Sequence, residues 1–199
     1  MYKRQLEYLD EGGLTENTIV IYTSDQGYWL GQHGFYDKRL ALETSIRMPF
    51  LIRYPKLIKP GSTNDDLCMN VDIAPTLLEL AGAKTPESMQ GRSMVPLLKG
   101  ETLEDWRTSQ FYTYWSTPRH QGIRTKQYTY VQLEGHPPEL FDRKSDPDQR
   151  HNIAGNPETA AILAELEAEL RQQIQDTDIS PDELPVGGTI DGGRQPTLK

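Results

Sequence analysis

The sequence predicts an α/β protein whose strand-and-helix region is followed by a small antiparallel sheet with a covering helix. A short apolar, β-branched run, Ile19–Tyr22, has the composition of a fully buried strand in a parallel sheet. Further along, residues 111–115 and 128–131 alternate aromatic, β-branched and polar side chains, as half-buried strands do. Residues 156–175 gather leucine and isoleucine on one helical face, and such a helix can cover one face of a sheet.

The first part of the chain is expected to run from a helix through two strands into a second helix. Tyr2, Leu6 and Leu9 fall on one helical face, and Gly12–Gly13 supplies the stop. After a polar loop, residues 50–54 form another predicted strand, because they are apolar and lie between two prolines. Asp72 is a good N-cap for a helix that ends at Gly82.

Asp72 and Arg92 can be interpreted in two ways. As polar residues close to apolar segments, both can take part in a functional site. An N-cap and a surface arginine explain them more simply, and we adopt that interpretation.

Composition shifts divide the chain into three regions. Residues 1–105 form the predicted strand-and-helix domain, and residues 106–176 form a small α+β subdomain. A third short strand at Glu139–Phe141 and a helix capped by Asn156 complete this subdomain. In residues 177–199, proline and glycine recur without periodicity, which predicts a loop or a disordered tail.

Charge and cysteine content limit the classes of function. The formal net charge of −8 over 199 residues argues against a nucleic-acid partner, which requires a basic face. The single cysteine, Cys68, excludes an internal disulfide, leaves the redox compartment open and is interpreted as a small buried hydrophobe. No stretch is long and apolar enough to predict a membrane span, and Met1–Gln5 leads into no signal-peptide core.

Polar residues follow the predicted strand at Ile19–Tyr22 directly. The carboxyl ends of strands in an open α/β sheet are where ligands and metals bind. Asp25 offers a carboxylate oxygen and Gln26 an amide oxygen, while Gly27 lets the backbone turn sharply or approach a ligand closely. Two adjacent oxygen ligands suit a hard cation such as calcium or magnesium. The alternative is a turn capped by the aspartate side chain.

A glycine-rich loop that follows carries an imidazole and a cation. Lys38 can lie over an anionic substrate, or it can be a solvated surface lysine. His33 can donate a proton to a leaving group or bind substrate, or it can hold the loop by hydrogen bonds. The remaining histidines, His120, His136 and His151, are interpreted as surface residues.

Several motifs in order resemble the sulfatase family of the alkaline-phosphatase superfamily. The motifs are S-D-Q-G, L-G-Q-H-G, D-K-R and E-T-S-I-R-M-P-F, followed by V-D-I-A-P-T-L-L-E-L-A-G and E-L-F-D-R-K-S-D-P-D-Q-R-H-N-I. The resemblance extends to about Gln175. It implies the C-terminal part of an alkaline-phosphatase-like α/β/α sandwich, of which residues 1–105 would be the last part, followed by the small antiparallel subdomain.

The resemblance also implies an activity and a set of site residues. Asp25 and Gln26 match the family's second pair of metal ligands, and the ion is usually calcium. Lys38 matches the family lysine that contacts the sulfate and the leaving-group oxygen, which implies hydrolysis of a sugar or aryl sulfate. Family members are often periplasmic or secreted. The sequence predicts no oligomeric state.

One part of the family pattern is missing. Sulfatases carry a C-x-P-x-R or S-x-P-x-R motif whose Cys or Ser is oxidised to formylglycine, the nucleophile. Cys68 lies in L-C-M-N-V, and in the run Ser116–Arg119 the arginine comes one position early. We therefore expect a C-terminal portion with half an active site, inactive alone. The alternatives are a phosphodiesterase or phosphonate monoester hydrolase of the same superfamily, and a non-catalytic remnant.

Overall fold

The computed structural model describes residues 2–116 and 119–177, which divide into two compact units. The first unit joins Met1–Asp25 to Met48–Arg107, and the second joins Gln26–Arg47 to the residues from Thr108 onward. Segment 26–47 thus belongs to the second unit, although it lies within 1–105 in the sequence. The boundaries drawn from composition stay a prediction, and residues 178–199 of the expected tail lie outside the described residues.

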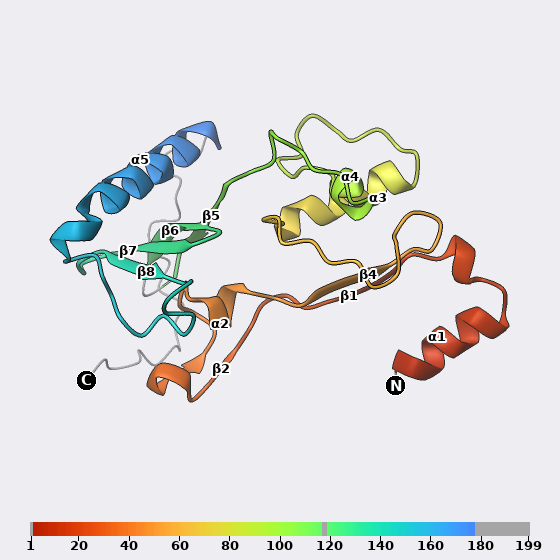
Figure 1. Cartoon of the computed structure of the whole chain (residues 1–199), viewed down its shortest axis with the longest axis horizontal. Coiled ribbons are helices and arrows are strands. Elements are labelled where there is room, and N and C mark those ends of the chain that lie inside the picture. The colour runs from red at the N-terminus through yellow and green to blue at the C-terminus, as the bar shows by residue number, and fades with distance from the viewer. Residues whose placement is uncertain (1, 117–118, 178–199) are drawn as a thin grey trace. The chain divides into compact units, whose positions relative to one another are not determined.

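The first unit contains helices and one pair of strands (Figure 1). The helix expected over residues 2–11 is confirmed, and Gly13 follows it with a φ of 65°. The helix expected after Asp72 is also confirmed and is followed by Gly82 with a φ of 70°. The elements are α1 (Tyr2–Glu11), β1 (Val20–Thr23), β4 (Phe50–Arg53), α3 (Ile73–Leu80) and α4 (Val95–Leu98).

The strand expected at Ile19–Tyr22 forms, but its partner and its burial differ from the prediction. β1 pairs with β4 in an antiparallel ladder, and the cross-strand pair Tyr22 and Leu51 is 44% and 66% exposed. The prediction of a fully buried strand in a parallel sheet is therefore wrong for this structure. An apolar, β-branched run indicates strand propensity, but neither the direction of its partner nor the layer above it is encoded locally.

Asp72 connects several segments of the first unit. It occupies the N-cap position of α3, but its side chain does not cap the helix. Its carboxylate, which is fully buried, accepts hydrogen bonds from the backbone N–H of Met69 at 2.7 Å and of Arg92 at 2.8 Å. The guanidinium of Arg107 binds both carboxylate oxygens, with Nη2 at 2.7 Å from Oδ1. The interpretation of Asp72 as a simple N-cap is therefore wrong, because its side chain is the centre of a buried ion pair.

An aromatic ring and a second arginine lie beside this ion pair. Trp106 is 7% exposed, and its indole N–H donates to the carbonyl of Leu67 at 3.0 Å. The guanidinium carbons of Arg92 and Arg107 lie 4.8 Å and 4.9 Å from the Trp106 ring centroid, which are cation–π distances. Arg92 also binds the Asp105 carboxylate at 2.8 Å, so it is more than the surface residue expected.

Cys68 lies next to this cluster but is exposed. The prediction of a buried small hydrophobe is therefore wrong. Its neighbour Leu67 takes the buried position instead, with 5% exposure. In an extended segment, adjacent side chains point to opposite sides, so an apolar flanking sequence does not decide which of two neighbours is buried.

The second unit is built around a four-stranded antiparallel sheet in the order β5-β6-β7-β8. The three strands expected from the sequence are present. The sequence interpretation missed β6, because His120–Thr125 contains a glycine and polar side chains, yet β6 lies between β5 and β7 in the sheet. The elements are β2 (Trp29–Leu30), β3 (Tyr36–Asp37), α2 (Glu43–Ile46), β5 (Ser109–Tyr114), β6 (His120–Thr125), β7 (Tyr128–Leu133), β8 (Glu139–Asp142) and α5 (Ala160–Asp176).

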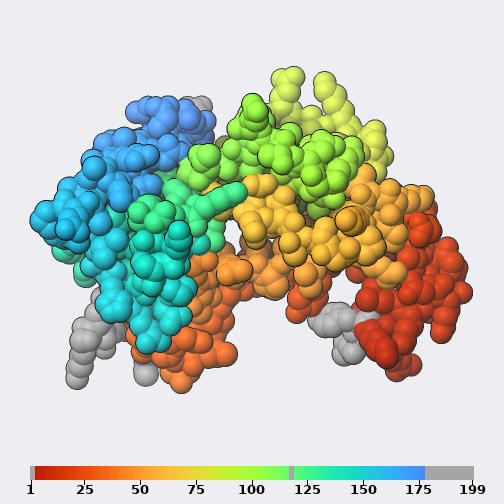
Figure 2. Space-filling view, viewed as in Figure 1, coloured from red at the N-terminus to blue at the C-terminus, as the bar shows by residue number. Residues whose placement is uncertain are grey.

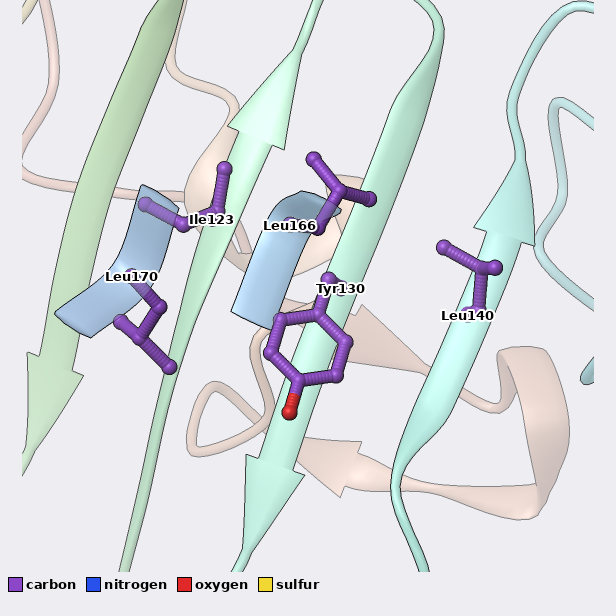
Figure 3. Packing of buried hydrophobic residues seen from close by; sticks show 5 residues of the cluster. All are labelled: Ile123, Tyr130, Leu140, Leu166 and Leu170. Atoms are coloured by element: carbon purple, nitrogen blue, oxygen red, sulfur yellow. The ribbon is translucent and has the colours of Figure 1, made fainter. Parts of the chain in front are cut away.

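The long C-terminal helix α5 covers this sheet, as predicted (Figures 1 and 2). Leu166 and Leu170 of the helix are 5% and 3% exposed and pack with buried residues of the strands. Figure 3 shows these leucines beside the sheet side chains, which are Ile123, Tyr130 and Leu140. The turn before the helix is capped by Asn156, whose side chain accepts from the backbone N–H of Glu158 at 3.0 Å.

His120 of β6 is buried, with 7% exposure, and its ring lies 5.2 Å from that of Tyr114. The prediction that it is a surface residue is wrong, whereas His136 and His151 are exposed as expected. Among the helices of the described residues, none is long and apolar enough to cross a bilayer.

The buried carboxylate of Asp72 should be essential for the stability of the first unit. We expect Asp72→Ala to lower the free energy of unfolding by about 3–5 kcal/mol, because it leaves the Arg107 guanidinium without its partner in a largely buried position. Urea unfolding followed by tryptophan fluorescence measures this loss. Asp105→Ala is the matched control, because its 78% exposed side chain should contribute less than about 1 kcal/mol. Equal losses for the two variants would contradict the assignment.

Candidate active site

Three of the four predicted site residues, Gln26, His33 and Lys38, fall on segment 26–47 of the second unit. This segment folds back on itself as a two-stranded ribbon. β2 and β3 pair antiparallel, with Trp29 opposite Asp37. The loop between the strands carries His33, and Lys38 follows β3 directly.

Trp29 anchors this ribbon. Its side chain is 1% exposed and packs with Leu42, Phe141 and Phe35. Its indole N–H also donates to the hydroxyl of Ser45, which is itself 1% exposed. A buried tryptophan with its polar atom paired fixes both the position and the orientation of the strand that carries it.

Gly27 brings the start of the segment against α2. Its backbone N–H donates to the carbonyl of Ser45 at 2.8 Å. A Cβ atom at this position would lie 1.8 Å from the carbonyl oxygen of Thr44, so only glycine fits. The close approach at Gly27 is to the protein's own chain, and an approach to a ligand stays a prediction. This contact fixes the residue directly after Gln26.

His33 is held in an unusual backbone conformation. Its φ of 55° lies in the left-handed region, which residues other than glycine seldom adopt. Its ring stands edge-on to that of Trp29 at 5.1 Å between centroids, and its Nε2 lies 2.7 Å from the carbonyl oxygen of Asp148. A carbonyl only accepts, so Nε2 carries the hydrogen. The loop-holding role considered for His33 is thus visible, and a role towards substrate stays a prediction.

The other predicted site residues lie close to the surface. Asp25 and Lys38 are exposed and Gln26 is half-buried. The backbone N–H of Lys38 donates to the Asp37 carboxylate at 2.7 Å, and the same carboxylate pairs with Arg39 at 3.1 Å. These contacts fix the backbone at Lys38.

Asp25 and Gln26 fit a calcium ion in chemistry, since both offer oxygen atoms. Calcium takes six to eight oxygen ligands, so two side chains can form only part of its shell. Within the described residues, no group of three or more histidine, cysteine, aspartate or glutamate side chains is placed to hold a metal ion. The donors present therefore match a hard cation in type but supply a minority of its ligands.

Glu43 ties α2 to the four-stranded sheet. Its carboxylate accepts from Arg124 of β6, with Nε at 2.5 Å from Oε1 and Nη2 at 3.1 Å from Oε2. Arg143, which follows β8, lies 3.4 Å away. All three side chains are at most 17% exposed, so water screens these charges little. The backbone N–H of Glu43 donates to the Gln149 side chain at 2.6 Å.

The sequence interpretation did not select Glu43, Ser45, Arg124 or Gln149. Glu43, Ser45 and Gln149 lie within motifs quoted for the family resemblance, so the motifs were a signal for their importance. Arg124 lies in β6, the strand that the sequence interpretation missed. Their pairing spans 81 residues for Glu43 with Arg124 and 106 residues for Glu43 with Gln149, and no local pattern reveals such partners.

Stability should depend on pH through Glu43. Burial raises the pKa of its carboxyl, but the hydrogen bond and charge of Arg124, with the charges of Arg143 and Arg47, lower it more, so that it lies below the ordinary value of 4.5. A lowered pKa means that folding favours the ionised form. The stabilisation is therefore present above pH 4.5 and is lost as the pH falls through the pKa of the folded chain.

Glu43→Gln should be less stable than the wild type at pH 7, by roughly 3–5 kcal/mol, since it leaves two largely buried arginines unpaired. It should also lose less stability between pH 5 and pH 3, because one linked proton is removed. Urea unfolding at a series of pH values measures both effects. Glu165→Gln on the exposed face of α5 is the control with the same charge change. A parallel pH profile for Glu43→Gln and wild type would refute the assignment.

Comparison with known proteins places these features in a family. A family model described as the C-terminal region of N-sulphoglucosamine sulphohydrolase matches residues 31–176. An N-acetylglucosamine-6-O-sulfatase of Bacteroides thetaiotaomicron is 44% identical over 193 residues, covering 90% of this chain and 34% of that protein. The chain thus spans about a third of the length of the curated relatives that it matches.

Solved structures agree with the sequence comparison. One, in complex with its substrate D-glucosamine-2-N,6-O-disulfate, is 40% identical with a TM-score of 0.86, covering 91% of this chain and 39% of that chain. A phosphonate monoester hydrolase from Silicibacter pomeroyi is 28% identical with a TM-score of 0.79, over 91% of this chain and 39% of that chain. The family model describes a region of a sulfatase, and the 44% identical relative is a sulfatase. This chain, with its alkaline-phosphatase-like fold, therefore belongs to the sulfatase family.

Proposed function

We propose that this chain supplies part of the active site of a sulfuric ester hydrolase that removes a 6-O-sulfate from a glucosamine-type sugar. The observation that carries the proposal is the anchored ribbon of segment 26–47. Buried contacts at Trp29, Ser45 and Glu43 hold a loop with His33 and Lys38 at its surface. A rigid support with exposed polar groups is what substrate positioning requires.

Lys38 is the group that faces the sulfate and the departing oxygen. Its ammonium neutralises the negative charge that develops on the alcohol oxygen as the sulfur–oxygen bond breaks. Because the surrounding backbone is fixed through Asp37, little reorganisation is needed when that charge appears. The exposed position of Lys38 leaves its side chain accessible to a substrate.

His33 contributes on the side of the leaving group. Its Nε2–H is engaged by the Asp148 carbonyl, so we assign the contact with substrate to Nδ1, the other ring nitrogen. Nδ1 accepts a hydrogen bond from a sugar hydroxyl when the ring is neutral and donates a proton when the ring is charged.

Asp25 and Gln26 hold a calcium ion together with ligands from outside the described residues. When bound, calcium supplies positive charge that stabilises sulfate oxygens. The carboxylate of Asp25 provides the negative charge that the ion requires, and the amide oxygen of Gln26 adds a neutral ligand.

The sugar specificity rests on the relatives. The 44% identical relative is named for N-acetylglucosamine-6-O-sulfate, and the 40% identical structure contains a disulfated glucosamine. Both substrates carry a sulfate at the 6-position of a glucosamine ring. The phosphonate monoester hydrolase is less similar, at 28% identity, and hydrolysis of a phosphonate ester is the alternative outcome of the same assay.

Lys38→Ala in the complete gene product should lower kcat on N-acetylglucosamine-6-O-sulfate by about 10²–10³-fold. KM should change less, because the lysine acts mainly on the charge of the transition state. Sulfate release measures the rate. Lys144→Ala, which removes another exposed cation of the same unit, should keep wild-type activity. The 199-residue chain alone should release no sulfate, since its sequence carries no C-x-P-x-R or S-x-P-x-R motif. Turnover of a phosphonate ester in place of the sulfate would replace the sulfatase assignment.

Asp25→Asn should weaken calcium binding in the complete gene product. We expect the calcium concentration for half-maximal activity, after chelation and titration, to rise by at least about 10-fold, because an anionic ligand becomes neutral. Asp65→Asn is the control, since it removes the same charge from an exposed loop of the first unit. An unchanged calcium requirement for Asp25→Asn would remove this residue from the metal site.

A further inference from the structure

Gln149 is a polar residue held in the interior of the second unit. It is 2% exposed and has a φ of 53°, in the left-handed region that favours glycine. It lies in a turn that starts at Asp146, whose carbonyl accepts from the Gln149 N–H at 3.0 Å. The Asp146 carboxylate accepts from the His151 N–H at 2.8 Å, which closes the turn.

The Gln149 side chain reaches the start of α2. Its Oε1 accepts from the backbone N–H of Glu43 at 2.6 Å. The first N–H groups of a helix have no partner within the helix, so an acceptor from elsewhere must satisfy them. Gln149 fills this role from a position 106 residues further along the chain.

The residue before Gln149 holds the candidate loop at a second point. The Asp148 carbonyl accepts from Nε2 of His33 at 2.7 Å. His33 and Gln149 are both left-handed residues other than glycine, with φ values of 55° and 53°. One hydrogen bond therefore connects His33 to the residue next to Gln149. Strained backbone conformations persist where surrounding contacts impose them, and they cluster at functional sites.

Only one of the two polar atoms of the Gln149 side-chain amide has a hydrogen-bond partner among the described residues. Within the described residues, its Nε2 is buried without a hydrogen-bond partner. Leaving a buried donor unpaired is unfavourable, so packing alone would favour an apolar side chain. The acceptor atom of the same amide is what the Glu43 N–H requires. The residue type is therefore explained by that single contact.

We propose that Gln149 is a positioning residue that, together with the Asp148 carbonyl, sets the placement of the His33 loop on segment 26–47. The proposal rests on the proposed function, in which His33 and Lys38 face the substrate. Gln149 orders the segment at the start of α2, and Asp148 orders it at His33. Loss of the first contact frees one end of the segment and lets the loop shift relative to the substrate.

Gln149→Asn is the variant that tests the contact with Glu43 most directly. Asparagine keeps the amide and tolerates a left-handed backbone, but it is one methylene shorter and cannot reach the Glu43 N–H. Gln149→Met keeps the length and approximate volume of the side chain but removes the acceptor, so it separates loss of the hydrogen bond from loss of packing. Gln172→Asn is the matched control, because it shortens an exposed glutamine of α5 that donates to Asp176 at 2.8 Å.

Hydrogen exchange of the Glu43 amide in this 199-residue chain tests the contact itself. We expect exchange to be faster by roughly 10-fold or more in both Gln149→Asn and Gln149→Met, and unchanged within about 2-fold in Gln172→Asn. Equal Glu43 exchange in wild type and Gln149→Asn would overturn the proposal. This measurement does not depend on sulfatase activity.

Kinetics of the complete gene product test the positioning. We expect Gln149→Asn to lower kcat by about 10- to 100-fold with KM changed by less than about 2-fold, because a small displacement of a reacting group is costly. Gln149→Met should lower kcat by a similar factor, because it also removes the acceptor. Wild-type kcat in Gln149→Asn or in Gln149→Met overturns the positioning role. A wild-type protein without sulfate release, combined with the expected exchange result, overturns the proposed function and leaves the contact in place.

Discussion

The carboxylate of Glu43, bound by Arg124 and close to Arg143, is the interaction on which the second unit depends. It joins a four-residue helix, too short to be stable alone, to a sheet that is stable through its own ladder and core. From this helix, Ser45 holds Gly27 and Trp29, and these two fix the ends of the stretch that leads into the ribbon. The candidate loop is thus ordered by a chain of contacts that begins at one ion pair.

Each unit contains a carboxylate that is largely removed from water and is bound by an arginine. Asp72 in the first and Glu43 in the second are carboxylates of low exposure, each bound by two N–H groups of one arginine. Asp72 is also bound by backbone N–H groups. Bidentate geometry with arginine compensates for the loss of water around a buried charge. Each carboxylate stands at the start of a helix and connects segments distant in sequence. Their common effect is to fix loops that no regular ladder holds.

Strain and polarity concentrate around the candidate loop. His33 adopts a left-handed backbone, as does Gln149 in the turn that contacts it through Asp148. Gly27 allows a backbone approach that any side chain would block. Such features are unfavourable for folding alone and are common where a protein orders groups for binding. They occur here on the segment that the family motifs single out.

The sequence by itself predicted the helix before Gly12 and the helix over residues 156–175, most strands of the small sheet and the family. It also supplied the residue types of the candidate site. These follow from local periodicity, turn residues and short motifs. It did not determine the antiparallel partner of β1, the strand β6, or the burial of Cys68 and His120. Only the tertiary structure decided these features, together with the Glu43 and Gln149 contacts. The reason is that pairing between residues far apart depends on how the whole chain packs, and it leaves no local periodicity to detect.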